Sequence, residues 1–274
     1  MPHSPLQTTI GSVPISHLGP LDAARLVVIV GRSNHRKQSA LLDTLALALH
    51  EQQGLSLCWF ASRRSETLRM LDLAFDRRFG LALGNWCEHG GIAGRLLRKL
   101  LYAALLLARP RHWDFFPALL RFTNAGSARD LRRFLGRLRA REFVLLGHSA
   151  GGIVASLAAR EPRVSHIACV GYPFRHPDQA EDPARTAHLA DLAKPMLILQ
   201  GRQDPYGAPA DALGYRLSRR ITIIPLTADH DYLDLSQPDL RACFEALARF
   251  VRPEAQTGQA CPELTAAAIL RSRP

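Results

Sequence analysis

Three residues in the second half of the chain have the types and the order of a nucleophile, an acid and a base. Ser149 lies in a G-x-S-x-G sequence at 147–151, Asp204 follows one short apolar run, and His230 follows the next. A serine hydroxyl becomes a strong nucleophile when a histidine takes its proton, and a carboxylate fixes the tautomer of that histidine. The order Ser, Asp, His therefore predicts a catalytic triad for acyl transfer.

The G-x-S-x-G sequence has the surroundings that a nucleophile elbow requires. The apolar residues 143–146 before it are typical of a buried strand, and residues 151–160 after it favour a helix. In such a strand–turn–helix unit the serine lies at the tip of a strained turn, and the N–H of the next residue, Ala150, donates to an oxyanion. The alternative interpretation is a glycine-rich turn in which the serine only caps the helix.

Asp204 and His230 are both expected in loops at the carboxyl ends of strands. Residues 195–200 (PMLILQ) precede Asp204, and residues 220–225 (RITIIP) precede His230. Active sites of open α/β sheets are built at these strand ends. The alternatives are a turn aspartate before a proline and a solvated loop histidine.

A second oxyanion donor is expected from the loop after the first predicted strand of the sheet, at residues 25–30. We nominate the backbone N–H of Arg32 or Ser33. Capping of the next helix is the alternative role for Ser33.

The elements that must position these residues alternate between strands and helices. We expect strands at 25–30, 55–60, 142–146, 164–170, 195–200 and 220–225, with helices at 37–50, 151–160, 208–217 and 238–251. This alternation predicts one α/β domain over residues 1–252, with a mostly parallel sheet and helices on both faces. Residues 1–24 are expected to form an irregular leader, and residues 253–274 a loosely attached tail.

Residues 72–140 interrupt the alternation and are expected to form a helical insertion after the second predicted strand. Within them, 95–122 is apolar and aromatic, and 129–141 is a basic amphipathic helix candidate. Continuous apolarity must be buried or must face a ligand. We expect 95–122 to be a lid over an acyl pocket, or alternatively a helix packed on the sheet. Contact with a membrane surface is a third, weaker hypothesis.

Composition narrows the possible partners and the compartment. The net charge is +11 over 274 residues, but the excess arginine is spread along the chain without a nucleic-acid-binding motif, so a nucleic-acid partner is not expected. The five cysteines are dispersed without metal-type spacing, which favours reduced core thiols, a cytoplasmic protein, and no metal or cofactor. We find neither a signal peptide nor an apolar run of membrane-spanning length.

Between about Phe143 and Tyr232, a set of short motifs forms a further pattern: Gly171-Tyr172-Pro173-Phe174, Pro177, Arg185, His188-Leu189, Gln200-Gly201, Asp204-Pro205-Tyr206-Gly207 and Asp229-His230. This pattern resembles the dienelactone-hydrolase-like branch of the α/β-hydrolase superfamily. That branch includes the third subunit of the non-specific-lethal chromatin complex and its bacterial relatives.

The resemblance implies an α/β-hydrolase fold and a triad at Ser149, Asp204 and His230. The chain departs from the pattern at Val30-Gly31, where the family usually has His-Gly, and at 59–63, where an Arg-Phe segment is usual. We therefore expect an esterase- or thioesterase-type hydrolase acting on a small-molecule acyl substrate. The alternative is a non-catalytic interaction module that keeps the fold, as the chromatin-complex relatives would allow.

Overall fold

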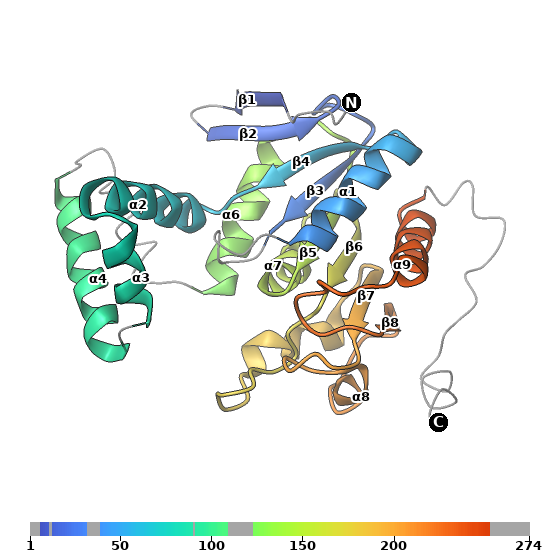
Figure 1. The fold of residues 1–274 in the computed structure, drawn as a ribbon. Coiled ribbons are helices and arrows are strands. Elements are labelled where there is room, and N and C mark those ends of the chain that lie inside the picture. Colours follow the sequence, from blue (N-terminus) through green and yellow to red (C-terminus); the bar gives the residue numbers. More distant parts are fainter. Residues whose placement is uncertain (1–5, 11–12, 32–38, 90, 109–122, 253–274) are drawn as a thin grey trace.

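The computed structural model describes residues 6–10, 13–31, 39–89, 91–108 and 123–252 (Figure 1). Eight strands in these ranges form one sheet in the order β1-β2-β4-β3-β5-β6-β7-β8. The strands are β1 (Leu6–Ile10), β2 (Val13–Leu18), β3 (Arg25–Val30), β4 (Ser56–Phe60), β5 (Glu142–His148), β6 (Val164–Val170), β7 (Met196–Gly201) and β8 (Ile221–Leu226). The six strands from β4 to β8 in this order are parallel, which confirms the predicted mostly parallel sheet.

Helices cover both faces of this sheet. On one face, α6 (Asn124–Arg137) and α7 (Ala150–Ala158) contribute residues such as Leu131 and Ile153 to a core with alternate residues of β3 and β5. On the other face, α1 (Ala40–Gln53) and α9 (Gln237–Phe250) contribute Leu45 and Leu247 to a second core. The central strands are therefore buried on both sides, as their continuous apolar sequences predict.

The chain before β3 is not the irregular leader that was predicted. β1 and β2 form an antiparallel hairpin, and β2 pairs with the edge strand β4. Their sequences, LQTTI and VPISHL, contain β-branched residues that favour strands, but they are short and the second is interrupted by Pro14, which weakens the signal. Pairing with an existing sheet edge supplies the hydrogen bonds that fix this hairpin, which is a tertiary effect.

The helical insertion begins earlier than predicted, directly after β4. Its first three helices are α2 (Arg63–Phe79), α3 (Leu81–His89) and α4 (Gly91–Leu107). Gly80 separates α2 from α3, and α4 begins at Gly91. Gly80 and Gly91 have positive φ, a conformation that ends helices and that glycine adopts without strain. We call α2–α4, residues 63–107, the arm. Figure 1 shows the arm standing off one side of the sheet, beside α6.

Other expected elements differ in length. The basic helix predicted at 129–141 is α6, which begins five residues earlier, where Thr123 caps it, and ends at Arg137. The helix predicted at 208–217 is only the single turn α8 (Pro209–Ala212). Between β6 and β7 lie two short 3-10 helices, η2 (Pro183–Arg185) and η3 (Ala187–Asp191).

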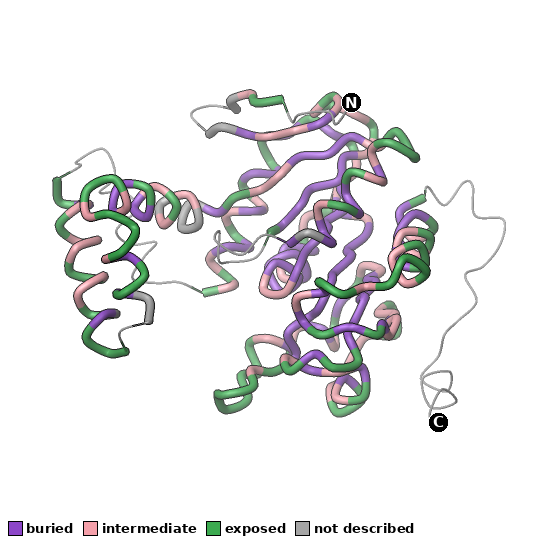
Figure 2. Tube along the Cα trace, viewed as in Figure 1, coloured by how far each residue is buried: buried purple, intermediate pink, exposed green. Residues whose placement is uncertain are grey.

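Buried residues are concentrated in the sheet and α7, whereas much of the arm and of the loops at the carboxyl ends of β6–β8 is exposed (Figure 2). The four cysteines in the described part of the chain, Cys58, Cys87, Cys169 and Cys243, are buried and free, as predicted for core thiols.

Candidate active site

Ser149 lies at the junction of β5 and α7 with φ 54° and ψ −126°, the strained turn predicted for a nucleophile elbow. Its N–H donates to the carbonyl of Val170 (3.0 Å), so the turn is tied to the neighbouring strand. The flanking glycines are required by close packing. A Cβ on Gly147 would lie 2.7 Å from the Gly151 carbonyl carbon, and a Cβ on Gly151 would overlap the carbonyl oxygen of Val30.

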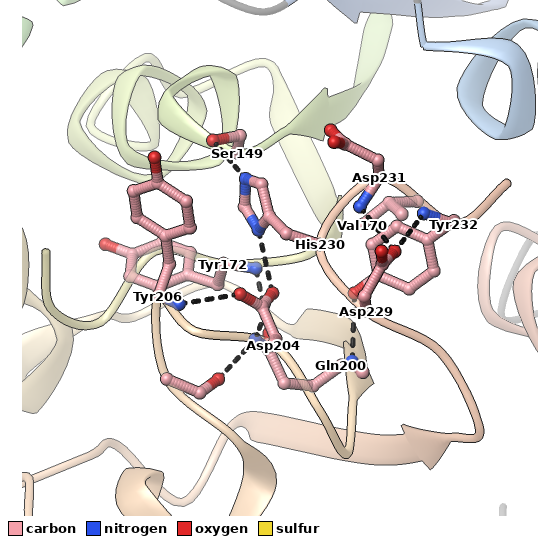
Figure 3. A network of polar contacts seen from close by, with 12 residues as sticks. Ser149, Val170, Tyr172, Gln200, Asp204, Tyr206, Asp229, His230, Asp231 and Tyr232 are labelled. Carbon is pink, nitrogen blue, oxygen red and sulfur yellow. Dashed lines mark hydrogen bonds and ion pairs between the residues drawn. The ribbon is translucent and has the colours of Figure 1, made fainter. Parts of the chain in front are cut away.

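The structure brings together the three residues predicted to form the triad (Figure 3). The Ser149 Oγ lies 2.9 Å from Nε2 of His230, and Nδ1 of His230 lies 2.8 Å from Oδ2 of Asp204. An ionised carboxylate only accepts hydrogen bonds, so Nδ1 carries the histidine proton and Nε2 is left to accept from the serine. This is the geometry that general-base activation of a serine requires.

Asp204 is held by two donors in addition to His230. Nε2 of Gln200 donates to Oδ2 (3.0 Å), and the N–H of Tyr206 donates to Oδ1 (2.8 Å). The other contacts of Gln200 fix its amide orientation, because Oε1 accepts from the N–H of Tyr172 and Nε2 also donates to the Gly207 carbonyl. Gln200 is fully buried, so this network orients a carboxylate that is itself only 2% exposed.

Sequence reasoning gave Gln200 no role, since a glutamine at a strand end carries no chemical signal by itself. The sequence indicated a role for Gln200 only through its position, four residues before Asp204 and on the strand that leads to it.

His148 holds the backbone of the catalytic loop. Its Nε2 donates to the carbonyl of His230 (3.2 Å), and its Nδ1 accepts from Oγ of Ser39 (2.5 Å). The carbonyl can only accept, which assigns the proton to Nε2. Ser39 also caps α1 by accepting from the Leu42 N–H. His148 thus links the loop of the base to the start of α1.

Tyr206 and Tyr232 lie against the two histidines. The ring of Tyr206 stands 4.4 Å from that of His230, centroid to centroid, and Figure 3 shows it on the Ser149 side. Tyr232, with φ 55°, accepts the Gly201 N–H and donates to the Leu199 carbonyl, and burial raises the pKa of its hydroxyl. Asp229 caps this turn by accepting the N–H groups of Asp231 and Tyr232.

The oxyanion donors are only partly described. Ala150 is the first residue of α7, so its N–H has no partner within the helix and lies beside the nucleophile. The other two nominated donors, Arg32 and Ser33, lie outside the described residues. Over the described ranges, no group of three or more His, Cys, Asp or Glu side chains is arranged to hold a metal ion.

The lid prediction is wrong for the described half of 95–122. Residues 95–107 belong to α4, which packs on α2 and α3, and the arm meets the rest of the domain where α2 packs on α6. Figure 1 shows α4 at the far left, well away from the start of α7. Residues 109–122 lie outside the described ranges. The described arm contains no helix that is both long and apolar enough to cross a membrane, and neither does any other described segment.

Comparisons with known proteins agree on the fold. A family model described as an alpha/beta hydrolase domain matches residues 126–250, which contain all three proposed triad residues. No curated protein sequence matches the chain.

Several solved structures superpose over most of the chain. An alpha-beta serine hydrolase homologue from Coxiella burnetii has a TM-score of 0.52 at 14% identity, covering 92% of this chain and 99% of its own. The esterase domain of a Rhodothermus marinus protein has a TM-score of 0.51 at 15% identity, with 86% and 90% covered. A Xanthomonas campestris α/β serine hydrolase without lid has a TM-score of 0.51 at 16% identity, with 92% and 95% covered.

The chain therefore has the α/β-hydrolase fold, as predicted. None of these comparisons bears on the chromatin-complex subunit, so that relation stays a prediction.

Proposed function

We propose that the protein is a serine hydrolase that cleaves an ester or thioester of a small-molecule substrate through a covalent acyl-enzyme. One observation carries this proposal, namely the continuous chain of contacts from Ser149 Oγ through His230 to Asp204 at 2.9 Å and 2.8 Å. A serine that merely capped α7 would not need a positive φ, and Ser149 makes no side-chain capping bond.

The reaction follows from this geometry. Ser149 Oγ attacks the substrate carbonyl carbon while its proton passes to Nε2 of His230, and Asp204 stabilises the imidazolium through Nδ1–H. The carbonyl oxygen becomes an oxyanion, which the N–H of Ala150 at the start of α7 stabilises. His230 then gives its proton to the departing alkoxide or thiolate. Water attacks the acyl-serine by the same steps in reverse and releases the acid.

Replacement of Asp204 tests the orienting role. Asp204→Asn would present an amide to His230 and favour the wrong tautomer, with an expected loss of kcat of roughly 10⁴-fold. The amide has a single oxygen, so one of the two N–H groups that now bond Asp204, from Gln200 and Tyr206, would lose its acceptor. A moderate loss of thermal stability is therefore expected as well.

The deciding experiment is turnover of p-nitrophenyl esters from acetate to palmitate by the full chain. Ser149→Ala and His230→Ala should each reduce kcat by about 10⁴-fold or more, and the double variant should be little worse, because triad members act as a unit. The Ser149→Ala, His230→Ala and double variants should keep the melting temperature within a few degrees of the unmutated protein.

Turnover that survives Ser149→Ala would place the nucleophile elsewhere. No turnover by the unmutated protein on any ester or acyl thioester would favour the non-catalytic interaction module instead.

A further inference from the structure

The arm carries most of the exposed large apolar side chains in the described part of the chain. Seven of eleven lie in it, although the arm is a small fraction of the protein: Leu73, Leu81, Trp86, Ile92, Leu96, Leu100 and Leu107. Scattered exposed leucines are normal on protein surfaces, but a cluster of this kind marks an interaction site.

Four of these residues form a continuous stripe along α4. Ile92, Leu96, Leu100 and Leu107 fall within roughly 80° of one another around the helix, given 3.6 residues per turn. They are 72%, 56%, 67% and 62% exposed, respectively. We call these four residues the α4 stripe. α3, which packs against another face of α4 at Gly94, carries two further exposed apolar side chains, Leu81 and Trp86.

The opposite face of α4 is fixed against α2, so the stripe cannot turn inward. Arg98 donates to the buried carboxylate of Asp72 (2.8 Å) and to the hydroxyl of Tyr102 (2.8 Å), and Tyr102 also bonds Asp72. The ring of Phe75 packs edge-on against Tyr102. Rotating α4 would separate a buried ion pair, which is strongly unfavourable.

The arm that carries the stripe has a net positive charge. Residues 63–107 contain eight basic and four acidic side chains, in a chain of net charge +11. Lys99 is exposed and lies at the edge of the stripe, one residue from Leu100, and Arg77 and Arg78 are exposed at the end of α2. Asp72, by contrast, is buried in the ion pair with Arg98.

The exposed apolar stripe and the positive charge of the arm together indicate which kind of partner binds this surface. A second copy would place one cationic arm against another, which like-charge repulsion opposes. An anionic phospholipid surface satisfies both features, because leucine and isoleucine side chains enter the acyl boundary while lysine and arginine meet the headgroups. No described helix is long enough to cross a bilayer, so α4 would lie in the plane of the interface.

We propose that the α4 stripe is a membrane-docking surface that binds anionic phospholipid bilayers. The docking does not depend on the proposed hydrolase activity, because no residue of the triad belongs to the arm.

The test is co-flotation of the full chain with vesicles. All proteins carry Ser149→Ala, so that hydrolysis of lipid cannot alter the vesicles. Vesicles of phosphatidylcholine alone are compared with vesicles of equal parts phosphatidylcholine and phosphatidylglycerol. We expect binding to the mixed vesicles, weakened by added salt, and at least roughly tenfold weaker binding to the neutral ones.

Two matched variants separate the stripe from general surface effects. Leu96→Glu/Leu100→Glu should reduce binding to mixed vesicles by roughly tenfold or more, since both the apolar contact and the local positive charge are lost. Leu213→Glu, at an exposed leucine beside α8, should bind as the unmutated protein does. The milder Leu100→Ser variant should bind mixed vesicles with an affinity between those of the other two variants. Thermal melts should show that all variants are folded.

Equal binding of the stripe variant and the Leu213 variant would overturn the proposal, as would equal binding to neutral and anionic vesicles. A lipid-independent dimer that the stripe substitutions dissociate would also overturn it, in favour of a second copy as the occupant. Absence of ester turnover by the protein with Ser149 intact, measured separately, would count against the proposed function and leave this result unchanged.

Discussion

Gln200 should be as important for stability as any apolar core residue. Its fully buried amide makes three hydrogen bonds: to the Asp204 carboxylate, to the Gly207 carbonyl and from the Tyr172 N–H. Gln200→Leu has nearly the same volume, so it leaves little cavity, but it removes all three bonds and leaves their partners buried. Each buried group that loses its partner costs about 1–3 kcal/mol, and a bond to a charged group is at the upper end.

The expected loss of unfolding free energy is therefore roughly 3–6 kcal/mol. For a domain of this size, each kcal/mol lowers Tm by about 2–4 °C, so Tm should fall by roughly 6–24 °C. The assay is chemical denaturation followed by tryptophan fluorescence, together with calorimetry. Gln203→Leu is the matched control, since Gln203 is exposed in the turn that follows β7 and its replacement should change stability by no more than about 0.5 kcal/mol.

Ester turnover measured below the Tm of the Gln200 variant gives a second readout. Because Asp204 keeps only Tyr206 as an additional donor, kcat should fall while Gln203→Leu keeps full activity. If Gln200→Leu and Gln203→Leu melt at the same temperature, the buried network does not stabilise the protein as argued.

Two further substitutions test the elbow and a second serine–histidine contact. Gly151→Ala should abolish activity and sharply lower Tm, because the new Cβ would overlap the Val30 carbonyl, whereas Gly136→Ala, with open space around it, should raise stability by about 0.5–1 kcal/mol in calorimetry. Burial lowers the pKa of His188, which contacts Ser156 Oγ, from 6.5 to about 4. Between these values the unfolded chain binds a proton that the folded protein does not, so stability should fall as pH drops through that window. His188→Gln should flatten this part of a denaturation-versus-pH profile, and an unchanged slope would contradict the assignment.

The chemistry of the site was predictable because its positions are set by local sequence. The strand before Ser149 and the helix after it fix the elbow, and two further apolar strands place Asp204 and His230 at the same sheet edge. Each of these signals lies within about ten residues of the side chain it positions, so pattern and chain order were sufficient.

The missed features depend on contacts between distant segments. β1 and β2 are fixed by the free edge that β4 offers, and nothing in the sequence of residues 6–18 by itself specifies that pairing. His148 and Gln200 acquire roles only when Ser39 and Gly207 arrive from other elements.

The lid prediction for residues 95–107 failed for a related reason. Apolar helical spacing indicates that one face is buried, but it does not say which partner covers it. In the folded protein α2 and α3 cover the inner face, and the outer face stays exposed.

The most direct test of the catalytic assignment is fluorophosphonate labelling of the full chain, read by intact mass and peptide mapping. The matched control is Ser156→Ala, since Ser156 also lies on α7 and its Oγ contacts a histidine at 2.8 Å, but it is buried and lacks the strained turn. We predict a single adduct on Ser149 that is absent in Ser149→Ala, strongly slowed in His230→Ala and unchanged in Ser156→Ala. An adduct that persists in Ser149→Ala, or a protein that never reacts although it is folded, would contradict the assignment of Ser149 as the activated nucleophile.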